Sequence, residues 1–129
     1  MKKPRLISRF LLWCSGLPLK INIREVDSIS ILDLKGAVVF DSGLALRNEV
    51  LRLLAMGKKN LLLNLEGVTR IDDSGIACLV GVHQSARAAK GSAKFLKPSK
   101  CVREWGAPYS PFWLEGYDDE SKALASFKQ

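Results

Sequence analysis

Residues Leu19–Arg24 alternate between apolar and polar side chains, which is the period of a strand with one buried face. The turn-forming pair Asp27 and Ser28 follows, and then the stretch Ile29–Leu34, which is rich in residues that favour strands. Gly36 comes directly afterwards and is expected to close this second stretch. The pattern therefore predicts a β-hairpin of two strands.

Two later stretches repeat apolar residues at the spacing of a helix. The first follows Asp41 and Ser42, both good N-cap residues, and ends at Gly57. Its apolar positions are Leu46, Val50, Leu53 and Leu54. The second covers Ser74–Lys90 and ends at Gly91, with Ile76, Leu79, Val80, His83 and Ala86 on one stripe. Each stretch predicts an amphipathic helix.

The remaining elements are shorter. Asn60–Leu65 is a bounded apolar run that predicts a central strand covered on both faces, and the alternating Ser92–Lys97 predicts an outer strand. Lys100–Trp105 predicts a third helix, and Asp118–Phe127 predicts a closing helix. The order β-β-α-β-α-β-α gives the α/β class, with a mixed four-stranded sheet and helices packed on it.

Residues 1–18 do not fit this pattern. Their basic start and the apolar run Phe10–Leu17 resemble a secretory signal, but Arg9 interrupts the segment and the run is too short to span a membrane. We predict a basic, apolar extension outside the fold, which leaves residues 19–129 as the domain. The extension could rest on a membrane surface or a partner, or reflect an upstream start codon.

The charge of the chain is concentrated at this end. The 129 residues carry a net charge of +7, and the first 20 contain five basic residues and no acidic one. Residues 21–129 contain 15 basic and 13 acidic residues, so the body is nearly neutral. Its basic residues in 87–103 have only Phe95 interleaved among them, which is typical of a solvated surface. We therefore predict no nucleic-acid partner.

The cysteines and the histidine argue against metal sites and hydrolase chemistry. Cys14, Cys78 and Cys101 are odd in number and widely spaced, which favours neither a disulfide framework nor zinc and suits the reducing cytoplasm. His83 is the one histidine, and it lies nine residues after Ser74, too far to meet it on one helix face. We predict no cofactor, no metal and no catalytic residues.

The most informative stretch is GVTRIDDSGI, Gly67–Ile76, which links the central strand to the second helix. Asp72, Asp73 and Ser74 are residues that any helix start favours, because their oxygens accept hydrogen bonds from unpaired backbone N–H groups. Local chemistry alone therefore favours simple capping.

The whole pattern resembles the STAS domain family, and in particular the bacterial anti-sigma factor antagonists. The hairpin that ends in Gly36, the strand LLLNLEGV at 61–68 and the loop IDDSG carry the resemblance, which covers residues 19 to 127. In the family, the first hydroxyl residue of this loop is phosphorylated by the anti-sigma factor. Here that position is Asp73. The family also continues regular structure through 105–113, where this chain reads WGAPYSPFW.

The resemblance implies a partner-binding loop formed by Asp72, Asp73, Ser74, Gly75 and Ile76. It also makes Asp41, Ser42 and Thr69 candidates for the partner surface. The implied function is a non-catalytic antagonist that binds a serine-kinase anti-sigma factor in the cytoplasm and so regulates transcription that depends on a sigma factor. The alternative is an accessory STAS module of a membrane transport or lipid-handling complex, with residues 1–18 as a tether.

Overall fold

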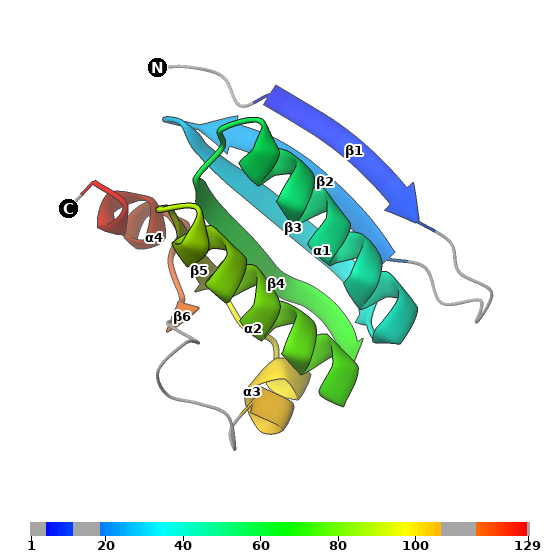
Figure 1. Cartoon of the computed structure of the whole chain (residues 1–129). Coiled ribbons are helices and arrows are strands. Elements are labelled where there is room, and N and C mark those ends of the chain that lie inside the picture. The colour runs from blue at the N-terminus through cyan, green and yellow to red at the C-terminus, as the bar shows by residue number, and fades with distance from the viewer. Residues whose placement is uncertain (1–4, 12–18, 107–115, 129) are drawn as a thin grey trace.

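The computed structural model describes residues 5–11, 19–106 and 116–128, and its centre is a six-stranded sheet in the order β1-β2-β3-β4-β5-β6 (Figure 1). The strands are β1 (Arg5–Leu11), β2 (Leu19–Val26), β3 (Ile29–Val38), β4 (Asn60–Ile71), β5 (Ser92–Leu96) and β6 (Gly116–Tyr117). The helices are α1 (Phe40–Ala55), α2 (Asp73–Ala88), α3 (Lys100–Gly106) and α4 (Glu120–Ser126).

The sheet is mixed, as the sequence predicts. Strands β1, β2 and β3 pair antiparallel, whereas β3, β4, β5 and β6 pair parallel. Parallel neighbours need crossover connections, and α1 and α2 supply them between β3 and β4 and between β4 and β5. The two helices lie side by side on one face of the sheet (Figure 1).

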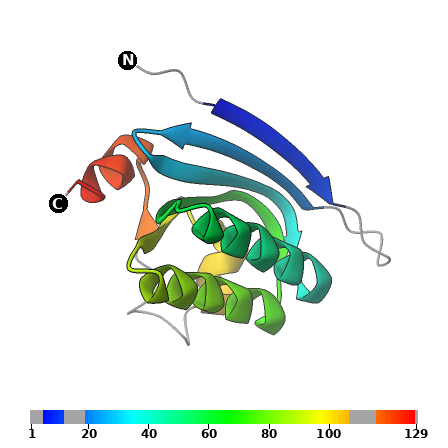
Figure 2. The ribbon, with the colours of Figure 1, turned by 45° about the horizontal axis from the view of Figure 1, so that its top comes forward.

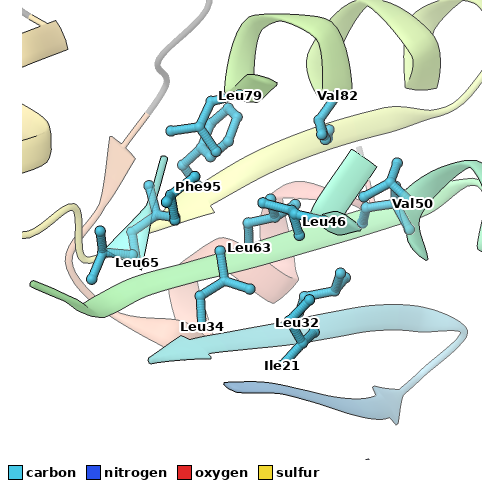
Figure 3. Close-up of a cluster of buried hydrophobic side chains, with 14 of the residues drawn as sticks. Ile21, Leu32, Leu34, Leu46, Val50, Leu63, Leu65, Leu79, Val82 and Phe95 are labelled. Atoms are coloured by element: carbon cyan, nitrogen blue, oxygen red, sulfur yellow. The ribbon is translucent and has the colours of Figure 1, made fainter. Parts of the chain in front are cut away.

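The main core lies between that face and the two helices (Figure 3). Alternate residues of the strands, such as Leu32 and Leu34 of β3, meet Leu46 of α1 and Leu79 of α2. Phe95 of β5 is the largest fully buried side chain. The alternation and most positions of the helical stripes found in the sequence therefore mark this core, although α2 also buries Val82, which lies outside the predicted stripe.

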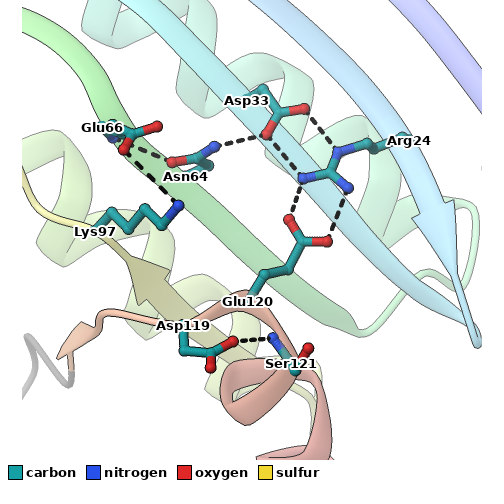
Figure 4. Close-up of polar contacts among 8 residues, drawn as sticks. All are labelled: Arg24, Asp33, Asn64, Glu66, Lys97, Asp119, Glu120 and Ser121. Carbon is teal, nitrogen blue, oxygen red and sulfur yellow. Dashed lines mark hydrogen bonds and ion pairs between the residues drawn. The ribbon is translucent and has the colours of Figure 1, made fainter.

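The other face of the sheet carries α4, on the side opposite α1 and α2 (Figure 2). Its Ala123 packs with Ile31 and Leu62 in a second, smaller core. Arg24 of β2 donates to Asp33 of β3 and also to Glu120 at the start of α4 (Figure 4). These hydrogen bonds, to Glu120 first and then to Asp33, raise the pKa of Arg24 above its usual value.

Two strands were not predicted. Arg5–Leu11 pairs with all but the last residue of β2, so the prediction that residues 1–18 lie outside the fold is wrong for this segment. Edge pairing needs only backbone hydrogen bonds, and Ser8-Arg9 hides the strand from a search for alternation. β6 is two residues long, which is too short for any period to show. The sheet thus has six strands where four were expected.

Several predicted boundaries also move. β4 continues to Ile71, whereas Leu65 was expected to end the strand. β3 continues past Gly36 to Val38, because Gly36 adopts φ +121° at an irregularity of the β3–β4 register instead of ending the strand. Helix α1 begins at Phe40, with Val39 as its N-cap, so Asp41 and Ser42 lie inside the helix. Most of the WGAPYSPFW stretch singled out in the sequence, 107–113, lies outside the described residues.

Candidate functional site

Strand β4 leads directly into α2, whose first turn is capped by a side chain. Asp72 is extended and accepts a hydrogen bond from the backbone N–H of Gly75 at 2.8 Å, while its own carbonyl oxygen accepts from Ile76 at 2.9 Å. The carboxylate thereby satisfies one of the N–H groups that a helix start leaves unpaired. The capping role expected for Asp72 is confirmed.

The next two residues face solvent. Asp73 and Ser74 are exposed in the first turn of α2, and neither side chain has a hydrogen-bond or ion-pair partner among the described residues. The negative charge of Asp73 lies at the positive end of the helix dipole, where a carboxylate is stable without a partner. This pair is the accessible part of the predicted loop.

Gly75 and Ile76 are buried, which corrects the prediction that they belong to a binding loop. Ile76 is only 2% exposed and packs in the main core. A Cβ added at Gly75 would overlap the carbonyl oxygen of Val38 and lie 2.7 Å from Cγ1 of Ile71. The glycine is therefore needed for the close approach of α2 to β3, not for contact with a partner.

Ser42 is also buried, so it cannot form part of a partner surface as predicted. Its hydroxyl accepts from the backbone N–H of Val39 at 2.9 Å and donates to the carbonyl oxygen of Ala37 at 2.7 Å. These bonds secure the turn from β3 into α1. The other two candidates, Asp41 in the first turn of α1 and Thr69 on β4, are exposed.

The structure adds two apolar residues that the sequence analysis missed. Phe40 is 62% exposed and Leu44 is 48% exposed, one turn apart on α1. They line a depression of about 220 Å³ between the two helices, together with Gly43, Arg47, Ser74, Ala77 and Cys78. The signal in the sequence was the 40/44 spacing, which places two large apolar residues outside the stripe of Leu46, Val50 and Leu53.

Cys78 of α2 contacts α1 directly. Its thiol donates to the carbonyl oxygen of Gly43 at 2.9 Å, and a Cβ on Gly43 would lie 3.3 Å from that of Cys78. Burial raises the pKa of the Cys78 thiol to about 11. The thiol is therefore protonated at neutral pH and is a poor nucleophile there.

The described residues contain no group of three or more histidine, cysteine, aspartate or glutamate side chains placed to hold a metal ion. Among the described helices, none combines the length and apolar character that crossing a membrane would require. His83 is partly buried on α2, with Nδ1 3.5 Å from the carbonyl oxygen of Ala93.

Fold and site together define a small α/β domain that presents the exposed start of a capped helix beside an apolar patch. The chain belongs to the STAS domain family, whose model matches residues 20–105. Among curated proteins, none matches the sequence of this chain.

Several solved structures are similar to this chain in fold. TM1081 of Thermotoga maritima, assigned as an anti-sigma factor antagonist, is similar with a TM-score of 0.74 and 19% identity over 83% of this chain and 93% of its own. The phosphorylated form of the Bacillus cell fate determinant SpoIIAA is similar with a TM-score of 0.66 and 18% identity, over 82% of this chain and 97% of its own. The murine anion transporter Slc26a9 is similar with a TM-score of 0.59 and 16% identity, over 81% of this chain and 18% of its own.

Proposed function

We propose that this chain is an anti-sigma factor antagonist, a non-catalytic cytoplasmic protein that binds a kinase-type anti-sigma factor and so regulates transcription. The observation that carries the proposal is the exposed pair Asp73 and Ser74 at the start of α2, beside the exposed side chains of Phe40 and Leu44. We call these four residues the docking surface. Family membership and the similar folds of antagonists support the proposal.

The construction of the helix start suits a docking role. Asp72 caps the helix and Gly75 brings it against Val38, so the exposed pair between them is held on a rigid element. A rigid surface loses little conformational entropy on binding. Unpaired polar groups next to exposed apolar ones are what a protein partner can cover.

Asp73 stands where the family carries its phosphorylated hydroxyl. A phosphate adds about −1.5 to −2 charge and three acceptor oxygens, whereas a carboxylate supplies one charge and two oxygens. Asp73 is thus a partial and permanent imitation of the phosphorylated state. Two versions of the proposal follow: an antagonist that binds weakly at all times, or one whose partner recognises the aspartate directly.

The second candidate is an accessory STAS module of a membrane transport complex. The similarity to part of Slc26a9 favours it, because the same fold there belongs to an anion transporter. The docking surface does not distinguish the two candidates, since either partner could cover it. The two candidates are distinguished by the identity of the protein that binds this chain.

The test is titration calorimetry of the full chain against each purified kinase-type anti-sigma factor of its organism. We expect one of them to bind, and Asp73→Arg to weaken binding at least about tenfold, as loss of an interface centre would. Glu104→Arg is the matched control, because the interaction of this exposed α3 residue within the described part of the chain is a 3.8 Å ion pair with Lys100.

Absence of binding by every anti-sigma factor would overturn the proposal. Recovery of the chain with a membrane transporter from its own cells would then favour the second candidate. Equal loss of binding by Asp73→Arg and Glu104→Arg would show that α2 does not form the docking surface.

A further inference from the structure

The depression between α1 and α2, which we call the interhelical pocket, is built from small and apolar residues. Gly43, Ala77 and Cys78 leave the space open where the helices meet, and Phe40 and Leu44 line it from α1. Because the Cys78 thiol already donates to the carbonyl oxygen of Gly43 at 2.9 Å, and even a Cβ on Gly43 would be crowded there, the helices cannot close over it. The pocket is therefore a permanent feature of this face.

Charge at the pocket is uneven. Arg47 lines it and has no ion-pair partner among the described residues, whereas Arg52, one turn further along α1, pairs with Glu49 at 2.9 Å. Ser74 lines the same pocket from α2 and connects it to the docking surface. The available cation favours an acidic group on whatever covers the pocket.

We propose that the interhelical pocket accepts one apolar side chain of the anti-sigma factor, with an acidic residue of that partner paired to Arg47. This inference rests on the proposed function and specifies how the partner is recognised. Side chains that fill pockets near the centre of an interface carry most of the binding free energy. The pocket, more than the exposed loop, then selects the partner.

The first experiment fills the pocket. Ala77→Leu adds an apolar side chain at an exposed position of α2 that lines the pocket, and Ala88→Leu adds the same side chain at the exposed end of the helix. We expect calorimetry with the anti-sigma factor to show at least about tenfold weaker binding for Ala77→Leu and unchanged binding for Ala88→Leu. Unfolding midpoints of both variants check that the fold is intact.

The second experiment reverses the charge. Arg47→Glu is expected to weaken binding at least about tenfold and to reduce its dependence on salt, because an interfacial ion pair is lost. Arg87→Glu is the control, since Arg87 is an exposed α2 residue outside the pocket with no ion-pair partner in the described part of the chain.

The third experiment measures the accessibility of the pocket in the unmodified chain. Cys78 lines it, so a partner side chain in the pocket should shield the thiol from alkylation. We expect the rate of Cys78 labelling at pH 9, followed by peptide mass spectrometry, to fall at least about tenfold in the complex, as occupied pockets exclude water and reagent. Cys101, a partly buried cysteine within α3 that does not line the pocket, serves as the internal reference.

The outcomes separate the inference from the proposed function. If the unmodified chain binds an anti-sigma factor but Ala77→Leu binds equally well and Cys78 stays reactive in the complex, the pocket inference falls and the proposed function stands. If the unmodified chain binds no anti-sigma factor, both fall.

Discussion

The starts of α1 and α2 lie side by side on one face of the sheet, yet they are built in different ways. The start of α1 is closed: Val39 is an N-cap without a side-chain hydrogen bond, and the buried Ser42 hydroxyl secures the turn from inside. The start of α2 is open: Asp72 caps it, and Asp73 and Ser74 face solvent.

This difference shows that one helix start serves to fix the path of the chain, whereas the other also presents polar groups at the surface. A buried hydroxyl that bonds two backbone groups fixes one chain path and leaves nothing for a partner to contact. A capped start with free side chains in its first turn is equally well fixed but offers charge and hydroxyl groups to solvent. Gly75 connects the two starts, because it lets α2 approach the last residue of β3. The start of α2 therefore presents exposed groups while its close approach to β3 keeps the helix in place.

The largest effect should come from breaking that contact. Gly75→Ala is expected to lower the free energy of unfolding by about 3 kcal/mol or more, because the new Cβ would overlap the carbonyl oxygen of Val38 and force the backbone to move. Gly81→Ala, on the same helix with open space around it, should raise the free energy of unfolding by about 0.5 to 1 kcal/mol. Urea denaturation of both variants checks the opposite signs, and two stabilising substitutions would contradict the close approach.

The next effect compares two serines in the first turns of the helices. Ser42→Ala should cost about 1 to 3 kcal/mol of stability, because the N–H of Val39 and the carbonyl of Ala37 both lose a buried partner. Ser74→Ala should change stability by less than about 0.5 kcal/mol, since its hydroxyl faces solvent. Thermal unfolding measures both. A similar loss in the two variants would mean that the two starts are not built differently.

A smaller effect separates the neighbouring aspartates of α2. Asp72→Ala should cost about 1 kcal/mol, because it removes the cap on Gly75. Asp73→Ala should cost only about 0.3 to 1 kcal/mol, which is the value of a charge at a helix start. Chemical denaturation at low salt and again at 1 M salt tests the assignment: the loss in Asp73→Ala should shrink with salt, and persistence at full size would contradict a dipole effect.

The smallest change in stability is expected for Asp73→Ser, whose effect should appear in binding. Under the proposed function, serine places a hydroxyl at the phosphoacceptor position, so incubation with the anti-sigma factor and ATP should add phosphate to residue 73 of this variant and none to the unmodified chain. If the inherited interface disfavours charge here, the variant should bind the partner more tightly by about 1 to 3 kcal/mol. Calorimetry that finds equal or weaker binding would show that the partner requires the aspartate.

The sequence by itself determined the elements whose signal is local. The alternation in β2, the strand-favouring residues of β3, the helical stripes of α1 and α2 and the cap residue Asp72 are local signals, and the elements that they predict are present in the structure. The order of these elements also fixed the mixed sheet, because consecutive strands joined by a tight turn pair antiparallel and those joined by a helix pair parallel. The exposed pair at residues 73 and 74 likewise lies where the loop predicted it.

Only the tertiary structure decided which of the candidate site residues face solvent. Ser42 carries a hydroxyl that suits an exposed helix start or a buried turn equally well, and Ile76 lies both on the predicted apolar stripe and in the predicted loop. The packing of α1 and α2 on β3 and β4 buries both. The distance between the two helices decides whether Phe40 and Leu44 are exposed and whether a pocket forms beside them. The contact of Gly43 with Cys78 sets this distance, and these two residues are 35 positions apart in the sequence. The edge strand β1 was decided in the same way, because its pairing uses backbone groups that every residue except proline has in full.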